Sequence, residues 1–231
     1  MIDIDINNFS SKPEKFDDIE LLLTVKSFNL QEIRKRYLES KKRSRSGSIK
    51  RRKPAQGGLV YIKIQNGNIT DEQILIKYKE ARGLDFKNGK LAVSSESKIY
   101  IFDIENNNIK KIQDPWLSYI HTVKFNSDCS RLLVASSGVD TIMEFEISTG
   151  KKIWEWNAWE EGINKGINPK TGEEHYLTKS RKKAKSLERK DKKVLLIQDP
   201  QNDKLPTALR AAFINSAEYD HDDNILLTFF H

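Results

Sequence analysis

Short runs of alternating apolar and polar residues recur along most of the chain, separated by polar turns. Residues 20–28 (ELLLTVKSF), 58–64 (GLVYIKI) and 69–76 (ITDEQILI) form one such group. Alternation with a period of two is typical of β-strands that bury one face. The pattern therefore predicts an all-β protein made of short antiparallel strands.

Three segments of this pattern share a common frame and indicate an internal repeat. They are RGLDFKNGKLAVSS from Arg82, HTVKFNSDCSRLLVASS from His121 and NSAEYDHDDNILLTFF from Asn215. In each, a short strand ends in an aromatic residue at the fifth position, and a polar turn leads into a second apolar strand. The dipeptide Asn88-Gly89 is the strongest hairpin signal among these turns.

The first two segments each continue into two further strands, and His121 follows Arg82 by 39 residues. Four short antiparallel strands with a period near 40 residues are typical of a β-propeller blade. We therefore predict one all-β domain over residues 1–231, a β-propeller of about three to three and a half blades. Since closed rings usually have about four to eight blades, we expect either a fragment or a homodimer that completes the ring in trans.

Three of the four tryptophans lie within the stretch KKIWEWNAWEEG, residues 151–162. Alternation in this predicted outermost strand places Trp154 and Trp156 on one face. We expect both rings to pack against the neighbouring blade. Trp159 lies beyond the strand, and the pattern does not assign it a place.

The bulk properties narrow the classes of protein. The longest apolar runs are far shorter than the roughly 20 residues of a membrane-spanning helix, so we predict no membrane span. The acidic, alternating amino terminus does not resemble a secretory signal. Cys129 is the only cysteine, so no intrachain disulfide can form, and we expect a cytoplasmic location.

The net charge of +7 is concentrated in two basic insertions, and the rest of the chain is net negative. Residues 29–57 would interrupt the first blade, with a short helix followed by a loop. Residues 158–206 would separate the third and fourth blades, and residues 173–193 within them would be a solvated helix. Such segments either remain solvated or bind nucleic acid and other polyanions without sequence specificity. The polyanion-binding candidates are Lys41, Lys42, Arg43, Arg45, Lys50, Arg51, Arg52 and Lys53.

Polar side chains recur where the innermost strands begin, at Arg82, His121 and Asn215. Innermost strands line the central channel of a propeller, so these side chains would converge on one funnel. His121 is the candidate acid, base or nucleophile, and the Arg82 guanidinium suits a small anion such as a sulfated or phosphorylated ligand. Arg210 precedes the last inner strand and could assist. The alternative is that each residue bonds local carbonyls at a strand end.

No metal or cofactor is predicted. The acidic run Asp220-His221-Asp222-Asp223 occupies the same position as the other hairpin turns, and we interpret it as a solvated turn.

Residues 120–231 resemble the arylsulfotransferase-type propellers, in which a W-E-W strand leads to an H-x-N-S strand and then to a G-N-x-L-x-S-x-R-H strand. Asn215 and Ser216 match the N-S pair, Asn224 and Leu226 match N-x-L, and His231 matches the final histidine. Phe213 and Phe230 stand where the family pattern has a histidine and an arginine.

The resemblance implies that a histidine accepts a sulfuryl group while basic neighbours hold its oxygens. Two hypotheses follow. In the first, the chain is a binding or scaffold module for an anionic ligand or partner. In the second, it is a sulfuryl-transferring enzyme with His121 as nucleophile or base. We favour the first, because the histidine and arginine of the family pattern are both replaced.

Overall fold

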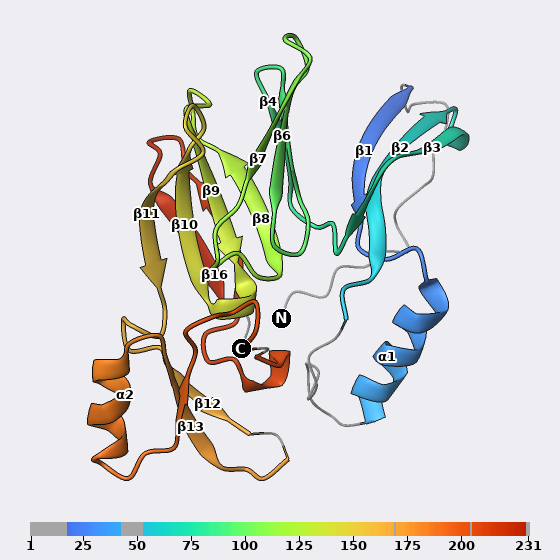
Figure 1. Cartoon of the computed structure of the whole chain (residues 1–231). Coiled ribbons are helices and arrows are strands. Elements are labelled where there is room, and N and C mark those ends of the chain that lie inside the picture. The colour runs from blue at the N-terminus through green and yellow to red at the C-terminus, as the bar shows by residue number, and fades with distance from the viewer. Residues whose placement is uncertain (1–17, 43–52, 169, 204, 230–231) are drawn as a thin grey trace, which may run out of the picture.

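The computed structural model describes residues 18–42, 53–168, 170–203 and 205–229 (Figure 1). This part of the chain is all-β, as predicted, apart from two α-helices and short 3-10 turns. The helices are α1 (Leu30–Lys42) and α2 (Arg181–Glu188). The strands are β1 (Ile19–Val25), β2 (Gln56–Gln65), β3 (Asn68–Lys79), β4 (Leu84–Lys87), β5 (Lys90–Ser94), β6 (Ile99–Asp103), β7 (Asn108–Ile112), β8 (Ile120–Phe125), β9 (Arg131–Ser136), β10 (Thr141–Glu146), β11 (Lys152–Asn157), β12 (Lys165–Ile167), β13 (Glu174–Thr178), β14 (Val194–Leu196), β15 (Ile214–Tyr219) and β16 (Ile225–Phe229).

The strands form small sheets whose order follows the chain. β4 to β7 and β8 to β11 are two antiparallel four-stranded sheets, and β1 to β3 form an antiparallel sheet of three. β15 and β16 pair as a hairpin. The strand groups predicted from the repeat are therefore present, with the predicted antiparallel order.

The hairpin turns explain why the repeat keeps polar residues between its first two strands. Asn88 and Gly89 both have positive φ, 46° and 70°, as the tight turn between β4 and β5 requires. Cys129 (φ 59°) and Asp223 (φ 60°) take the same left-handed conformation in the corresponding turns. Asp220 stabilises its turn by accepting hydrogen bonds from the backbone N–H groups of Asp222 and Asn224 at 2.9 and 2.8 Å.

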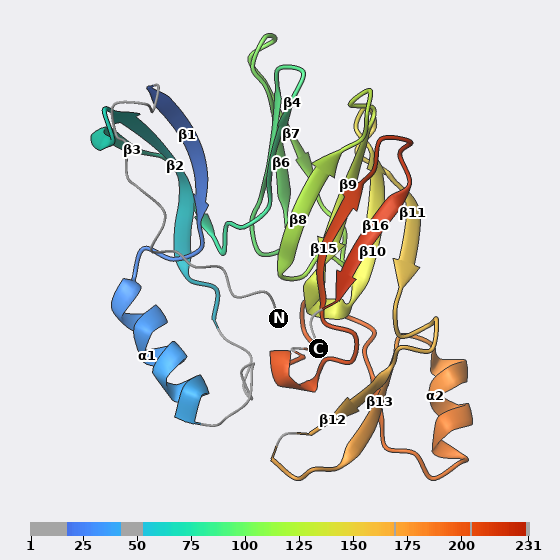
Figure 2. The same cartoon turned by 180° about the vertical axis from the view of Figure 1, so that it is seen from behind.

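Three of the sheets, β4–β7, β8–β11 and β15–β16, pack face to face in this order, and their first strands lie side by side (Figures 1 and 2). Thr122 Oγ1 in β8 accepts a hydrogen bond from the backbone N–H of Ala217 in β15, at 3.1 Å. Asp85 Oδ2 in β4 accepts one from Phe125 N in β8, at 2.8 Å. The apolar cores fill the spaces between the sheets. The core between β4–β7 and β8–β11 includes Ala92, Ile99, Ile101, Val123, Leu132, Val134, Met143 and Phe145.

The tryptophans of the outermost strand have different environments. Trp156 packs on the apolar cluster between β8–β11 and β15–β16, and its ring lies edge-on to Phe229 with 6.4 Å between centroids. Packing against the neighbouring sheet is therefore confirmed for Trp156. Trp154 remains 39% exposed, and its packing against the neighbouring sheet stays a prediction. Trp159 is completely buried.

The second basic insertion is more ordered than predicted. Its residues form a three-stranded sheet, β12-β13-β14, in which β13 and β14 run parallel. The prediction of one solvated helix across the second basic segment is wrong, because residues 174–178 are strand β13. Only Arg181–Glu188 are helical, and Ser180 caps the helix by accepting from Lys183 N. A separate core that includes Trp159, Leu177 and Ile197 supports this sheet.

The first basic insertion begins with a helix, as predicted, and β2 starts at Gln56. In both views α1 extends from the same end of the sheets as β12, β13 and α2 (Figures 1 and 2). No helix in the described part of the chain is long and apolar enough to cross a membrane.

Candidate functional site

The structure brings Arg82, His121 and Asn215 together, although they are far apart in the sequence. The Arg82 guanidinium donates from Nη1 to His121 Nε2 at 2.5 Å. His121 Nδ1 lies 3.3 Å from Asn215 Oδ1. Because a guanidinium can only donate hydrogen bonds, Nε2 is the acceptor and the imidazole proton resides on Nδ1. The three side chains therefore form one connected chain of hydrogen bonds at the starts of neighbouring strands.

Arg210, the assisting residue proposed from the sequence, also reaches this place. Its guanidinium carbon lies 5.7 Å from the centre of the Tyr119 ring, and that of Arg82 lies 5.9 Å from the same centre. Tyr119 is 4% exposed and has a positive φ of 46°. An aromatic ring attracts guanidinium groups through its electron-rich face. Tyr119 thus gathers two arginines beside His121.

A buried carboxylate anchors the first arginine. Glu80 is completely buried and pairs with Arg82 Nη2 at 3.1 Å and with Lys26 Nζ at 3.9 Å. Its other oxygen accepts a hydrogen bond from Ala55 N at 3.2 Å. Since a buried charge is costly unless it is paired, these contacts fix Glu80 and orient Arg82 towards His121.

The electrostatic environment keeps His121 neutral. Its pKa is lowered from 6.5 to about 3, mainly by burial and in addition by the positive charges of Arg82, Arg210 and Lys26. The hydrogen bond to Asn215 acts in the opposite direction but is weaker. The potential at the imidazole is therefore positive, as is typical of a place that accepts an anion.

The segment that carries Arg210 and Asn215 is held by the buried side chain of Asp140. Asp140 Oδ2 accepts hydrogen bonds from Trp159 Nε1 at 3.0 Å, Ala212 N at 3.1 Å and Ala211 N at 3.3 Å. Oδ1 accepts from Ile214 N at 3.3 Å. One carboxylate thus fixes the backbone immediately before β15 and at its first residue, and links it through Trp159 to the second insertion.

Gly83 allows β4 and β8 to approach closely at the site. A Cβ at this position would lie 3.0 Å from Val123 N and 3.1 Å from the carbonyl carbon of Thr122. Both contacts are to backbone, which cannot rotate away. The absence of a side chain at Gly83 therefore sets the spacing at which Arg82 reaches His121.

Sequence reasoning missed the supporting residues Glu80, Gly83, Tyr119 and Asp140. Glu80 and Gly83 flank Arg82 in the sequence EARG, and Tyr119 lies two residues before His121. Their closeness to the first residues of the repeats could have indicated them. No local sequence pattern indicates Asp140. Its backbone hydrogen-bond donors are 71 to 74 residues away in the sequence, and Trp159 is 19 residues away.

Residues that matched the arylsulfotransferase pattern have structural partners in the hairpin. Ser216 Oγ is hydrogen-bonded to Thr228 Oγ1 at 2.7 Å. Asn224 Nδ2 donates to Asp220 Oδ2 at 3.0 Å, and Leu226 is exposed. Phe230 and His231 lie outside the described residues. Within the described residues, no group of three or more His, Cys, Asp and Glu side chains could hold a metal ion.

Of the predicted polyanion-binding residues, Lys41, Lys42 and Lys53 are described and exposed. Lys41 and Lys42 form the last turn of α1. Arg43, Arg45, Lys50, Arg51 and Arg52 lie outside the described residues.

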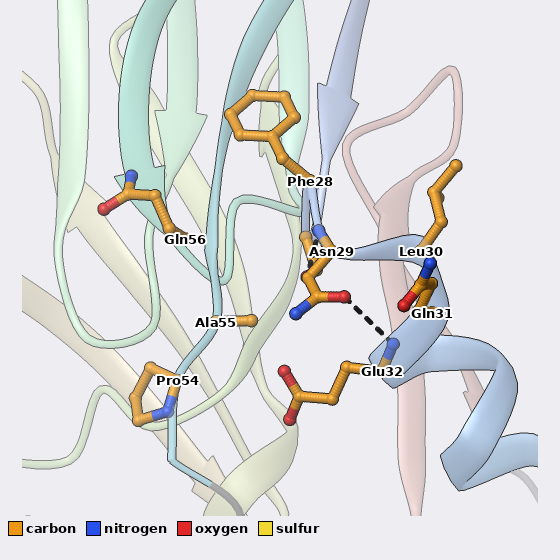
Figure 3. Close-up of a pocket in the computed structure, with 9 residues that line it drawn as sticks. Phe28, Asn29, Leu30, Gln31, Glu32, Pro54, Ala55 and Gln56 are labelled. Carbon is orange, nitrogen blue, oxygen red and sulfur yellow. Dashed lines mark hydrogen bonds between the residues drawn. The ribbon is translucent and has the colours of Figure 1, made fainter.

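A separate open hollow of about 880 Å³ lies where α1 and β2 begin (Figure 3). Asn29 Oδ1 accepts from Glu32 N at 3.0 Å at its edge, which caps the first turn of α1. The lining residues are Ser27, Phe28, Asn29, Leu30, Gln31, Glu32, Pro54, Ala55 and Gln56. The hollow is separate from the candidate site, because its lining includes none of Arg82, His121, Arg210 and Asn215.

No protein-family model and no curated protein matches the chain. Similar solved structures include Hsv2 from Kluyveromyces lactis, at 13% identity and TM-score 0.37, with 75% of this chain and 43% of that chain covered. Glutaminyl cyclase from Myxococcus xanthus is 12% identical at TM-score 0.35, covering 76% of this chain and 68% of that one.

A chain of a nidogen/laminin complex is 13% identical at TM-score 0.36, with 44% of this chain and 39% of that chain covered. The chain thus spans about two fifths of the length of the Hsv2 and nidogen/laminin chains. At these TM-scores the matches carry no argument about ligand or activity.

Proposed function

We propose that the chain is a propeller-type binding module that holds a small oxyanion, such as sulfate or phosphate, between Arg82, Arg210, His121 and Asn215. The observation that carries this proposal is the placement of two arginine guanidiniums on one buried ring, next to a histidine kept neutral by burial and by these positive charges. Guanidinium forks match the oxygens of sulfate, phosphate and carboxylate. Asn215 is exposed, so the ligand would enter from its side.

The propeller interpretation is part of the same proposal. Two four-stranded sheets follow each other in the chain, and first strands β4, β8 and β15 lie side by side. This arrangement supports blades around an axis. The polar residues at the strand starts then occupy equivalent positions in successive blades, which explains why the repeat places Arg82, His121 and Asn215 together.

Sulfuryl transfer by His121 is the alternative that the family resemblance implies. A nucleophilic imidazole must direct a free ring-nitrogen lone pair at the sulfur, and with the proton on Nδ1 this lone pair is on Nε2. Here Nε2 accepts a hydrogen bond from Arg82 at 2.5 Å, so attack would require this contact to break first. We therefore propose binding rather than transfer.

The test is a titration of the protein with sulfate and with inorganic phosphate at constant ionic strength, with the His121 imidazole followed by NMR. We expect a saturable shift of the His121 resonances, because an anion beside the ring opposes the positive potential that lowers its pKa. Arg210→Lys keeps the charge but removes the fork, and should weaken binding about tenfold. Arg189→Lys, at an exposed position, is the matched control.

The Arg189→Lys control is needed because sulfate and phosphate also act on proteins by exclusion from their surface, without occupying a site. A response that does not saturate, or that is equal in the two variants, would refute the proposal. Release of nitrophenol from an aryl sulfate by the parent protein, lost in His121→Gln, would instead support the transfer alternative.

A further inference from the structure

Helix α1 exposes an unusual number of large apolar side chains. Leu30 is 73% exposed, Tyr37 62%, Leu38 47% and Ile33 38%. The helix extends away from the sheets in both views (Figures 1 and 2). Single exposed apolar residues are common on protein surfaces, whereas four on one short helix indicate a surface that binds a partner.

These side chains lie on one side of the helix. With 3.6 residues per turn, Leu30, Ile33 and Tyr37 are separated by three and four positions and therefore align. Leu38 lies about 100° further round the helix from Tyr37, at the edge of this side. Arg34 and Lys41 follow Leu30 and Leu38 by four and three positions, so they lie on this side too. The helix thus combines an apolar stripe with cations along it.

The charge of α1 is strongly positive. The helix has five Lys or Arg residues against Glu32 and Glu39, and its last turn carries Lys41 and Lys42. An occupant of this surface must therefore be anionic as well as apolar.

We infer that α1 is an interfacial helix that binds to the surface of an anionic lipid bilayer. A basic helix with an apolar stripe inserts that stripe at the boundary between headgroups and acyl chains, and its cations meet the lipid phosphates. Arg34 and Lys41 can lay their aliphatic stems at the boundary while their charged ends reach the phosphates. A nucleic acid would satisfy the charges alone and leave the four apolar side chains in water.

Helix α1 is already formed without a membrane. Asn29 caps its first turn by accepting from Glu32 N (Figure 3), and Phe28 N is bonded to Gln56 O at the start of β2. An isolated helix of 13 residues is marginal in water. The connection to the sheet therefore presents the apolar stripe in its binding conformation.

Helix α2 provides a comparison within the same chain. It contains Arg181, Lys182, Lys183 and Lys185, but its Ala184 is buried and it exposes no large apolar side chain. A helix with a charged surface and no exposed apolar stripe, such as α2, is typical of a helix that faces water. If charge alone bound membranes, α2 would serve as well as α1.

The experiment is co-sedimentation of the full chain with phosphatidylcholine vesicles, with and without added phosphatidylserine. We expect binding only when phosphatidylserine is present. Leu30→Gln combined with Tyr37→Gln keeps helix propensity and charge but removes the two most exposed apolar groups. This variant should bind about tenfold more weakly or worse. Lys182→Gln combined with Lys185→Gln in α2 should bind as the parent does.

Unchanged thermal unfolding would verify that the α1 variant is folded. Binding of heparin should be equal for the parent and the α1 variant, since both have the same charges. The inference is overturned if the parent binds heparin or RNA but no vesicles, if the α1 variant binds vesicles as tightly as the parent, or if the α2 variant loses as much affinity. Arg210→Lys should leave vesicle binding unchanged, so this inference does not depend on the proposed anion site.

Discussion

His121 gives a quantitative prediction for the stability of the protein at acidic pH. Its pKa is 6.5 when solvated and about 3 in the folded protein, because of burial and the nearby charges of Arg82, Arg210 and Lys26. Between pH 3 and pH 6.5, His121 is therefore protonated in the unfolded state and neutral in the folded state. Folding stability is consequently intact above pH 6.5 and decreases as the pH falls towards 3.

The size of this effect follows from the two pKa values. One unit of pKa difference corresponds to about 1.4 kcal/mol. At pH 5 the solvated imidazole is mostly protonated and the buried one is neutral, so His121 alone should lower the free energy of unfolding by about 2 kcal/mol relative to pH 7. His121→Gln cannot titrate, so it should lack this part of the pH dependence.

The measurement is urea unfolding at pH 7 and pH 5, in chloride without sulfate or phosphate, followed by tryptophan fluorescence. Trp159 is buried and should report the transition. His221→Gln is the matched control, since the His221 side chain is 87% exposed. If the parent and His121→Gln lose the same stability between pH 7 and pH 5, the imidazole is not held neutral by its surroundings and the reasoning is wrong.

Three further predictions concern the support of the site. Asp140→Asn retains a residue suited to the positive φ of this position, but its amide cannot accept every hydrogen bond that the carboxylate accepts. We expect the free energy of unfolding in urea to fall by about 2–4 kcal/mol and sulfate to bind more weakly. A variant as stable as the parent would contradict this role of Asp140. Gly83→Ala should cost about 1–3 kcal/mol and separate Arg82 from His121, detected as a raised His121 pKa in an NMR titration. Sulfate should also raise that pKa, because its negative charge opposes the nearby cations; an NMR titration that finds the same His121 pKa with and without saturating sulfate would exclude contact with the ring.

The strands and the neighbourhood of the candidate site residues were predictable from the sequence where the signal was local or repeated. Alternation and the Asn88-Gly89 turn predicted the strands β4 to β11, because hairpin pairing depends on neighbouring residues. The common frame of the repeat also placed Arg82, His121 and Asn215 at equivalent strand starts. Equivalent positions in packed sheets become neighbours in space, and the structure brings these residues together.

Tertiary structure decided what depends on partners distant in the sequence. Residues 174–178 became strand β13 within a segment of high charge, because the strand pairs with β12 and β14 and its Leu177 joins the core around Trp159. Trp154 and Trp156 have the same alternation but different exposure, since only Trp156 meets the core of the next sheet. Alternation assigns a residue to a face, and tertiary packing determines whether that face is covered.

The sequence by itself determined the all-β class, the strand order within the sheets and the register of the polar residues at the strand starts. Only the tertiary structure decided that Tyr119 joins two arginines, that Glu80 and Asp140 hold them, and that His121 is neutral. These properties arise from burial and from charges brought together across the sheets. A low pKa for an imidazole requires desolvation and nearby cations, and neither can be specified by the residues adjacent to it in the chain.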